Sequence, residues 1–180
     1  MSVVARADVW EARRKATAYD AYARASRIDE DPKRDDEAEA LYRRAIELDP
    51  SLVGALTNLG NLCYRRRRVG EATDLYERAV AIDERHAEAH YNLGYILLER
   101  RDPWRSIPHF RRALAANPGF ADAHFNVAVA YEQIGERSAA RRHWERYVEI
   151  EPKGAWAEAA RGRLGCATGL AAKLATCAST

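Results

Sequence analysis

Apolar and small residues in the middle of the chain recur at helical spacing, in two neighbouring segments. In residues 53–66 they lie three and four positions apart, which places them on one face of a helix: Ala55, Leu56, Leu59, Gly60, Leu62 and Cys63. A second helix is predicted over 69–82, with Ala72, Leu75, Tyr76, Ala79 and Val80 on its apolar face. A polar turn separates the two segments, so the pattern predicts an antiparallel helix pair.

This helix pair is repeated twice more, at a spacing of 34 residues. Three features are repeated: an asparagine followed by an apolar and a small residue, an aromatic residue in the second helix, and a proline at the end of the repeat. Glu84 replaces the proline at one of these positions. The repeated residues are Asn58, Asn92 and Asn126, then Tyr76, Phe110 and Trp144, then Pro50, Pro118 and Pro152. A repeat of this length predicts an all-α solenoid, in which each repeat buries its apolar face against its neighbours.

The repeats give the chain a simple organisation. We expect a leader at 1–15, an irregular first repeat at 16–52, three repeats at 53–86, 87–120 and 121–154, a capping helix at 155–164 and a tail at 165–180. The first helix of the irregular repeat is predicted within 16–28, and Trp10 either extends it or belongs to the leader. In the capping helix, Trp156, Ala159, Ala160 and Leu164 are expected to face the last repeat. Gly60 and Gly94 are expected where two helices cross closely.

Residues 53–154 resemble the tetratricopeptide repeat. The resemblance rests on the small residue after Asn-Leu, the alanines flanking an aromatic residue and the closing proline. His90 and His124 stand where that family often has tryptophan, and Arg67 and Arg101 stand where it prefers glycine at the end of the first helix. Left-handed backbone at a non-glycine residue costs roughly 1 kcal/mol. We therefore expect these two turns to be formed differently.

The resemblance implies that the first helices line a concave groove that binds a peptide segment or helix of another protein. Side chains beside the core stripe would face this groove. They are Thr57, Asn58, Asn61, Tyr64, Arg65, Glu88, Tyr91, Asn92, Tyr95, Glu99, Asp122, Phe125, Asn126, Val129 and Gln133. The three repeated asparagines form a ladder of carboxamides, which can both donate to and accept from a peptide backbone.

Acidic residues outnumber basic ones in the predicted groove and its immediate neighbourhood. Glu88, Glu99, Asp122 and Glu132 are matched only by Arg65, so a clamp for a carboxylate is disfavoured and a neutral or basic ligand is expected. The whole chain has 29 basic and 27 acidic residues and a net charge of +2, which gives no support for direct nucleic-acid binding. The run 65–68 is four arginines at a helix end, where the helix dipole favours cations.

Other features exclude further classes of function. Three cysteines without a CxxC spacing do not predict a disulfide framework or a zinc site, and they fit a reducing compartment. The N-terminus does not resemble a signal peptide, and no apolar run approaches the ~20 residues that span a bilayer. We therefore expect a cytoplasmic protein without a membrane segment.

The repeated histidines do not predict a metal site. His90 and His124 lie one repeat apart, as do His109 and His143, and equivalent atoms of neighbouring repeats are separated by about 10 Å. Partly buried neutral histidines are the favoured interpretation. No catalytic constellation is expected to converge either, so we predict no cofactor and no enzyme activity.

The favoured function is a protein-interaction scaffold or adaptor. One alternative is the partner-binding module of a transcription regulator, because some stretches look loosely similar to the repeat half of bacterial regulators that carry a helix-turn-helix. The other alternative is a structural protein that assembles with copies of itself. One local feature, Pro108 inside a predicted second helix, is expected to kink or loosen that helix, and water can satisfy the freed carbonyl if that side faces solvent.

Overall fold

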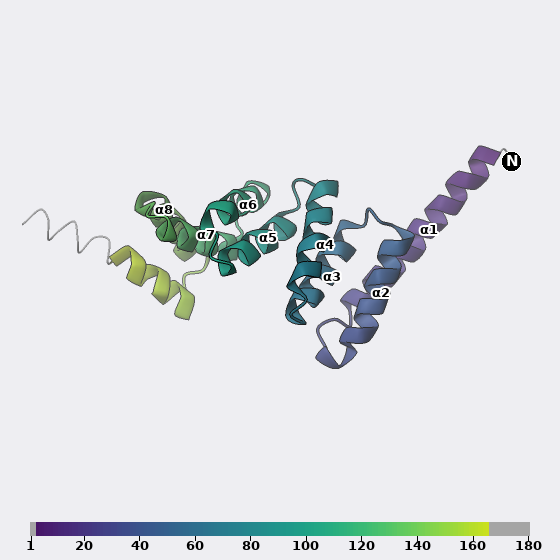
Figure 1. Ribbon diagram of the computed structural model, residues 1–180, viewed down its shortest axis with the longest axis horizontal. Coiled ribbons are helices and arrows are strands. Elements are labelled where there is room, and N and C mark those ends of the chain that lie inside the picture. Colours follow the sequence, from purple (N-terminus) through teal and green to yellow (C-terminus); the bar gives the residue numbers. More distant parts are fainter. Residues whose placement is uncertain (1–2, 166–180) are drawn as a thin grey trace, which may run out of the picture. The chain divides into compact units, whose positions relative to one another are not determined.

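The computed structural model describes the backbone of residues 3–165 and the side chains from residue 8 onward, and this part of the chain contains helices and turns but no strand (Figure 1). The predicted all-α solenoid of helix pairs is confirmed. The chain divides into two compact units, residues 1–89 and 90–180. The predicted tail lies almost wholly outside the described residues, as do Cys166 and Cys177.

The N-terminal unit contains two helix pairs. The first is α1 (Val3–Ser26) and α2 (Asp35–Leu48), joined through the short 3-10 helix η1 (Pro32–Arg34). The second is α3 (Val53–Arg65) and α4 (Val69–Ile82), and α2 also packs on α3. The predicted apolar stripes form the core, since Ala25, Tyr42, Leu56, Leu59 and Ala72 are all at most 1% exposed.

Helix α1 begins earlier than the sequence predicted. Most of the predicted leader is helical. The N-terminal end of α1 reaches beyond α2, with which the rest of α1 pairs (Figure 1). The physical reason is that residues 3–26 contain no glycine or proline that would end a helix, and Glu11 and Lys15 form an i,i+4 ion pair of 3.0 Å. Trp10 therefore belongs to α1, where it is 63% exposed.

The C-terminal unit contains two further helix pairs and a final helix. The pairs are α5 (Ala87–Glu99) with α6 (Pro103–Ala116) and α7 (Ala121–Gln133) with α8 (Arg137–Ile150), and α5 begins three residues before the unit border. Helix α6 continues through Pro108 without interruption, contrary to the expected loosening. Pro108 is exposed, so solvent can reach the side of the helix where its backbone donor is missing.

The predicted close crossings are present. A Cβ atom added at Gly60 would lie 2.5 Å from Cε1 of Tyr76, and one added at Gly94 would lie 2.9 Å from Cδ1 of Phe110. Each aromatic ring thus packs directly on the backbone of the facing helix, 16 positions earlier in the chain. These two glycines are required by space and not by backbone conformation.

The turns within the three regular repeats have one geometry, so the expectation of different turns at Arg67 and Arg101 is wrong. Their φ angles are 62° and 60°, and Gly135, at the same repeat position, has 82°. The amide of the following residue bonds the carbonyl five positions back in every case, with N–O distances of 2.9, 3.0 and 2.9 Å. Burial of the flanking helices holds both arginines in the left-handed conformation that glycine adopts without cost.

A helix over residues 155–165 packs on the last repeat. Its inward residues are Ala157, Ala160 and the half-buried Leu164, and Ala160 joins the core around Trp144 and Tyr147. The predicted inward position of Ala159 is wrong, because it is exposed, whereas Trp156 contacts Phe125 of the last repeat as predicted but stays 66% exposed. No helix in the described part of the chain is long and apolar enough to cross a membrane.

Candidate functional site

The predicted groove residues of α3 are largely used within the N-terminal unit. Thr57 is fully buried and its hydroxyl contacts Val53 O and Nε2 of His86, each at 3.0 Å, so it is not presented to a ligand. Asn58 donates to Oη of Tyr42 at 3.2 Å, and Asn61 accepts from Oη of Tyr76 at 2.7 Å. A ligand at these two half-buried carboxamides would compete with bonds inside the chain. Tyr64 is half-buried.

Arg65 is an ion-pair partner of α2 and its preceding turn. It donates to Asp29 O at 2.8 Å and to Oδ1 of Asp35 at 3.3 Å. Arg65 is the one cation predicted in the groove, and these contacts occupy it within the chain. It therefore gives no support to a site that clamps a carboxylate, which the sequence disfavoured.

Glu88, at the start of α5, is exposed.

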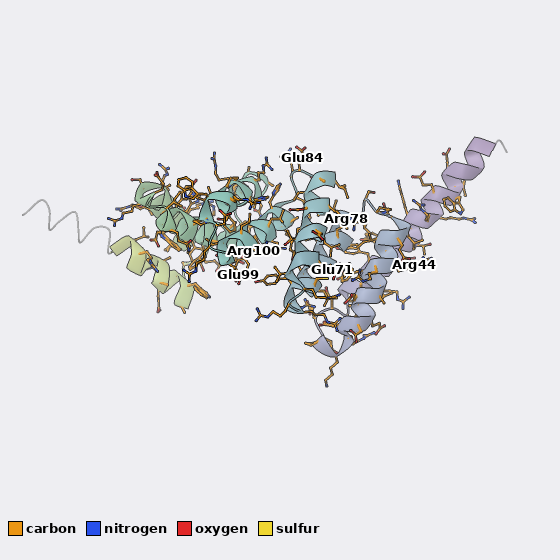
Figure 2. The ribbon with its side chains drawn as sticks, in the orientation of Figure 1. Arg44, Glu71, Arg78, Glu84, Glu99 and Arg100 are labelled. Carbon is orange, nitrogen blue, oxygen red and sulfur yellow. The ribbon has the colours of Figure 1, made fainter. Side chains whose placement is uncertain are left out.

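The neighbouring arginines also contact α2, in a network centred on Glu39. This carboxylate accepts from Arg66 at 2.8 Å and from Arg43 at 2.8 Å, and Arg68 donates to both of its oxygens. Hydrogen bonding from Arg68, foremost, lowers the pKa of Glu39 to about 2. Glu71 of α4, labelled in Figure 2, joins the network through Arg43 and Arg68. Arg66 and Arg68 of the arginine run therefore join the second helix pair to the first through Glu39 of α2.

In the C-terminal unit, α5 and α7 contact each other through side chains, and their predicted groove residues are here called the α5–α7 face. Nδ2 of Asn126 donates to Oη of Tyr91 at 3.1 Å and to its own helix at Asp122 O at 3.0 Å. Tyr91 and Tyr95 are half-buried and their ring centroids lie 6.2 Å apart. The other predicted members from these helices are half-buried or exposed: Asn92, Glu99, Asp122, Val129 and Gln133.

Two aromatic clusters support this face. The Tyr91 ring lies 4.7 Å from that of Phe120 and 6.0 Å from that of Phe110. Burial, foremost, raises the pKa of the Tyr91 hydroxyl above its usual value, so it is neutral at physiological pH. The α5–α7 face thus combines neutral hydroxyl and carboxamide groups with apolar ring surface.

The second cluster surrounds Phe125. Its ring makes edge contacts with Trp144, Tyr147 and Trp156, at centroid distances of 4.8, 5.2 and 5.1 Å. Phe125 is therefore a packing residue as well as a candidate contact. Glu132, which the sequence placed among the groove acids, accepts from Nε1 of Trp144 at 3.1 Å and pairs with Arg163 at 3.0 Å, so it fastens the final helix.

The four repeated histidines form two pairs that the sequence analysis missed. Nδ1 of His90 lies 3.2 Å from Nδ1 of His109, and Nδ1 of His124 lies 2.9 Å from Nδ1 of His143. Burial, foremost, lowers the pKa of His109 and of His143 to about 4. The lowered pKa values favour the neutral form predicted above, and His90 and His124 are more deeply buried than the sequence predicted. The spacing of 19 residues, present in both repeats, was the signal that could have revealed the pairing.

Among the described residues, no group of three or more histidine, cysteine or acidic side chains is placed to hold a metal ion. Cys63 is buried, and burial, foremost, raises the pKa of its thiol to about 11, so the reactive thiolate is disfavoured.

Comparisons with known proteins agree with the repeat architecture. One family model described as "TPR repeat" matches residues 60–99, and two described as "Tetratricopeptide repeat" match residues 91–155 and 19–52. No curated protein matches the chain.

Solved structures with the same fold include two crystal structures of MamA. The first is 27% identical, covers 69% of this chain and 72% of MamA, and has a TM-score of 0.61. The second is 25% identical, covers 76% and 74%, and has a TM-score of 0.65. A mutant O-GlcNAc transferase of Thermobaculum terrenum is 26% identical over 76% of this chain but only 26% of its own length, with a TM-score of 0.64.

The three family matches fall on the helix pairs that the structure contains, and together they account for most of the described residues. Repeats of this kind generally bind other proteins, which makes the chain a protein-interaction scaffold in the broad sense. The chain belongs to the tetratricopeptide-repeat family.

Proposed function

We propose that the protein is an adaptor without enzymatic activity, and that it binds an extended peptide segment of a partner protein on the α5–α7 face. The observation that carries the proposal is the pair of half-buried tyrosines, Tyr91 and Tyr95, beside the Asn126 carboxamide. Aromatic residues next to polar groups are typical of binding hot spots, because they supply contact area at low cost in conformational entropy.

The charge of this face indicates the kind of segment. Glu99 and Asp122 are exposed members, whereas the described side chains of α5 and α7 include no lysine or arginine. A neutral or basic segment fits this surface better than an acidic one. The Asn126 carboxamide, already bonded through Nδ2, positions the Tyr91 hydroxyl and orients the face.

Site-specific photocrosslinking tests the proposal. Tyr95 is replaced by p-benzoylphenylalanine, which is also aromatic, in cells that naturally produce the protein. The matched control carries the same group at Trp104, an aromatic residue of α6 that is 69% exposed and lies outside the α5–α7 face. We expect a partner crosslinked from position 95 and not from position 104.

Affinity measurements then identify the contact. A synthetic peptide of the crosslinked segment is titrated against the wild type and against Tyr95→Ala and Trp104→Ala. Loss of a hot-spot side chain weakens binding by at least about fivefold, so only Tyr95→Ala should show such a loss. Equal affinity of all three proteins would reject the α5–α7 face as the binding site.

A further inference from the structure

An open pocket of about 430 Å³ lies where α7 begins and α8 ends. Its walls come from the turn before α7, the end of α8 and the start of the final helix. The residues that shape it are Phe120, Asp122, Tyr147, Glu151, Lys153 and Trp156. Trp156 makes a T-shaped ring contact with Phe125 and is still 66% exposed, so most of its indole is presented to solvent.

Charge distinguishes this pocket from a purely apolar hollow. Two carboxylates, Asp122 and Glu151, line it together with one ammonium group, that of Lys153. Burial raises the pKa of Tyr147, and the charges of Asp122 and then Glu151 raise it further. Both carboxylates thus act on the floor of the pocket, where Tyr147 is only 6% exposed.

We propose that this pocket binds a basic side chain, arginine or lysine, of the partner peptide. A largely exposed indole ring beside two carboxylates suits a cation, which gains attraction from the ring quadrupole and from the negative charges. Arginine fits better than lysine, because its planar guanidinium can stack on Trp156 and also donate to a carboxylate.

The inference rests on the proposed function, since the pocket adjoins the α5–α7 face through two residues. Asp122 belongs to both, and Phe120 packs on Tyr91 with ring centroids 4.7 Å apart. A segment lying over Tyr91 could therefore place one side chain in the pocket. Lys153 repels such a cation, which predicts that its removal strengthens binding.

The test uses three capped tripeptides at low ionic strength: acetyl-Gly-Arg-Gly-amide, the same peptide with neutral citrulline, and the same peptide with glutamate. Binding is followed by NMR through the indole N–H signal of Trp156, assigned with Trp156→Phe. We expect saturable shifts with the arginine peptide and at least about twofold weaker binding of the citrulline peptide. Equal binding of the two, or preference for the glutamate peptide, would overturn the proposal.

Charge-neutralising variants give an independent check that does not depend on repacking the ring. Asp122→Asn and Glu151→Gln should each weaken the arginine peptide about two- to fivefold, and Lys153→Gln should strengthen it. Glu149→Gln is the matched control, because Glu149 is an exposed α8 carboxylate outside the pocket. Unchanged affinity in the Asp122 and Glu151 variants, or an opposite sign for Lys153→Gln, would contradict a cation site.

The two proposals fail separately. A partner peptide that depends on Tyr95, together with no binding of the arginine tripeptide, would reject the pocket alone. Binding of the tripeptide, together with partner affinity that is unchanged by Tyr95→Ala, would reject the α5–α7 face alone.

Discussion

Nδ1 of His124 lies 2.9 Å from Nδ1 of His143, and Nε2 of His124 lies 3.1 Å from Pro118 O. Because a carbonyl can only accept, Nε2 of His124 carries a proton, and its neutral Nδ1 must accept from the Nδ1–H of His143. A second proton on His124 would make its Nδ1 a donor, so the bond would survive only if His143 moved its own proton to Nε2 and accepted at Nδ1. The charged groups acting on this pair are Arg111, Arg142 and Arg146, and they oppose protonation as well.

The first prediction is that acid destabilises the C-terminal unit through its histidine pairs. The pKa of His143 falls from 6.5 to about 4 on folding, as does that of His109, so the unfolded chain binds more protons. The stability that the neutral histidines contribute is fully present above pH 6.5, and it is lost as the pH falls from 6.5 toward 4. We expect a loss on the order of 2–3 kcal/mol for each pair, measured by urea unfolding at pH 7.5 and pH 5.0.

The chain supplies its own control for this prediction. The same repeat positions in residues 53–86 hold Leu56 and Leu75, both buried. His124→Leu combined with His143→Leu should therefore fold and lose part of the difference in stability between the two pH values. An unchanged pH dependence in that variant would show that the pair does not titrate with folding.

A second prediction concerns the close helix crossings. Gly60→Ala and Gly94→Ala should each destabilise the fold by about 1–3 kcal/mol, because the added methyl would overlap Tyr76 or Phe110. Gly60→Ala should be the more destabilising of the two. Its added Cβ would lie 2.5 Å from the nearest ring atom, whereas the Cβ added at Gly94 would lie 2.9 Å from its nearest ring atom. Gly70→Ala is the control, because nothing lies within 4 Å of its added Cβ. Thermal unfolding that ranks Gly70→Ala with the other two would refute the packing argument.

Much of the fold was predictable because helical periodicity and the 34-residue repeat are local signals. The bounds of α4 agree with the sequence pattern residue for residue. Pairings between helices were less accessible, because Asn61 with Tyr76 or His124 with His143 requires knowing how two helices are rotated. For the same reason, several predicted groove side chains proved to be bonded within the chain, and Thr57 proved to be buried.

A third prediction addresses the repeated turns. Arg101 has a left-handed φ of 60°, and Gly135, at the same repeat position, adopts a left-handed φ of 82° without strain. Arg101→Gly should therefore stabilise the C-terminal unit by up to about 1 kcal/mol, and Gly135→Arg should destabilise it by a similar amount. Paired denaturant titrations measure both effects. Two changes of the same sign would contradict a common turn geometry.

A fourth prediction concerns the final helix. Ala160 is fully buried against the last repeat, whereas its neighbour Ala159 is exposed. Ala160→Glu should cost several kcal/mol, on the order of 2–4, because it buries an unpaired charge. Ala159→Glu should be nearly neutral. If melting temperatures of the two variants coincide, the helix does not cover the last repeat as described.

The central claim is that a partner peptide binds on the α5–α7 face, and chemical-shift mapping tests it most directly. The isotope-labelled protein is titrated with the peptide obtained by crosslinking, and the backbone amide signals are followed. We predict the largest shifts at Tyr91, Tyr95 and Asn126, with little change around Trp104 on the outer side of α6. Shifts concentrated on α6 and absent from α5 and α7 would contradict the account.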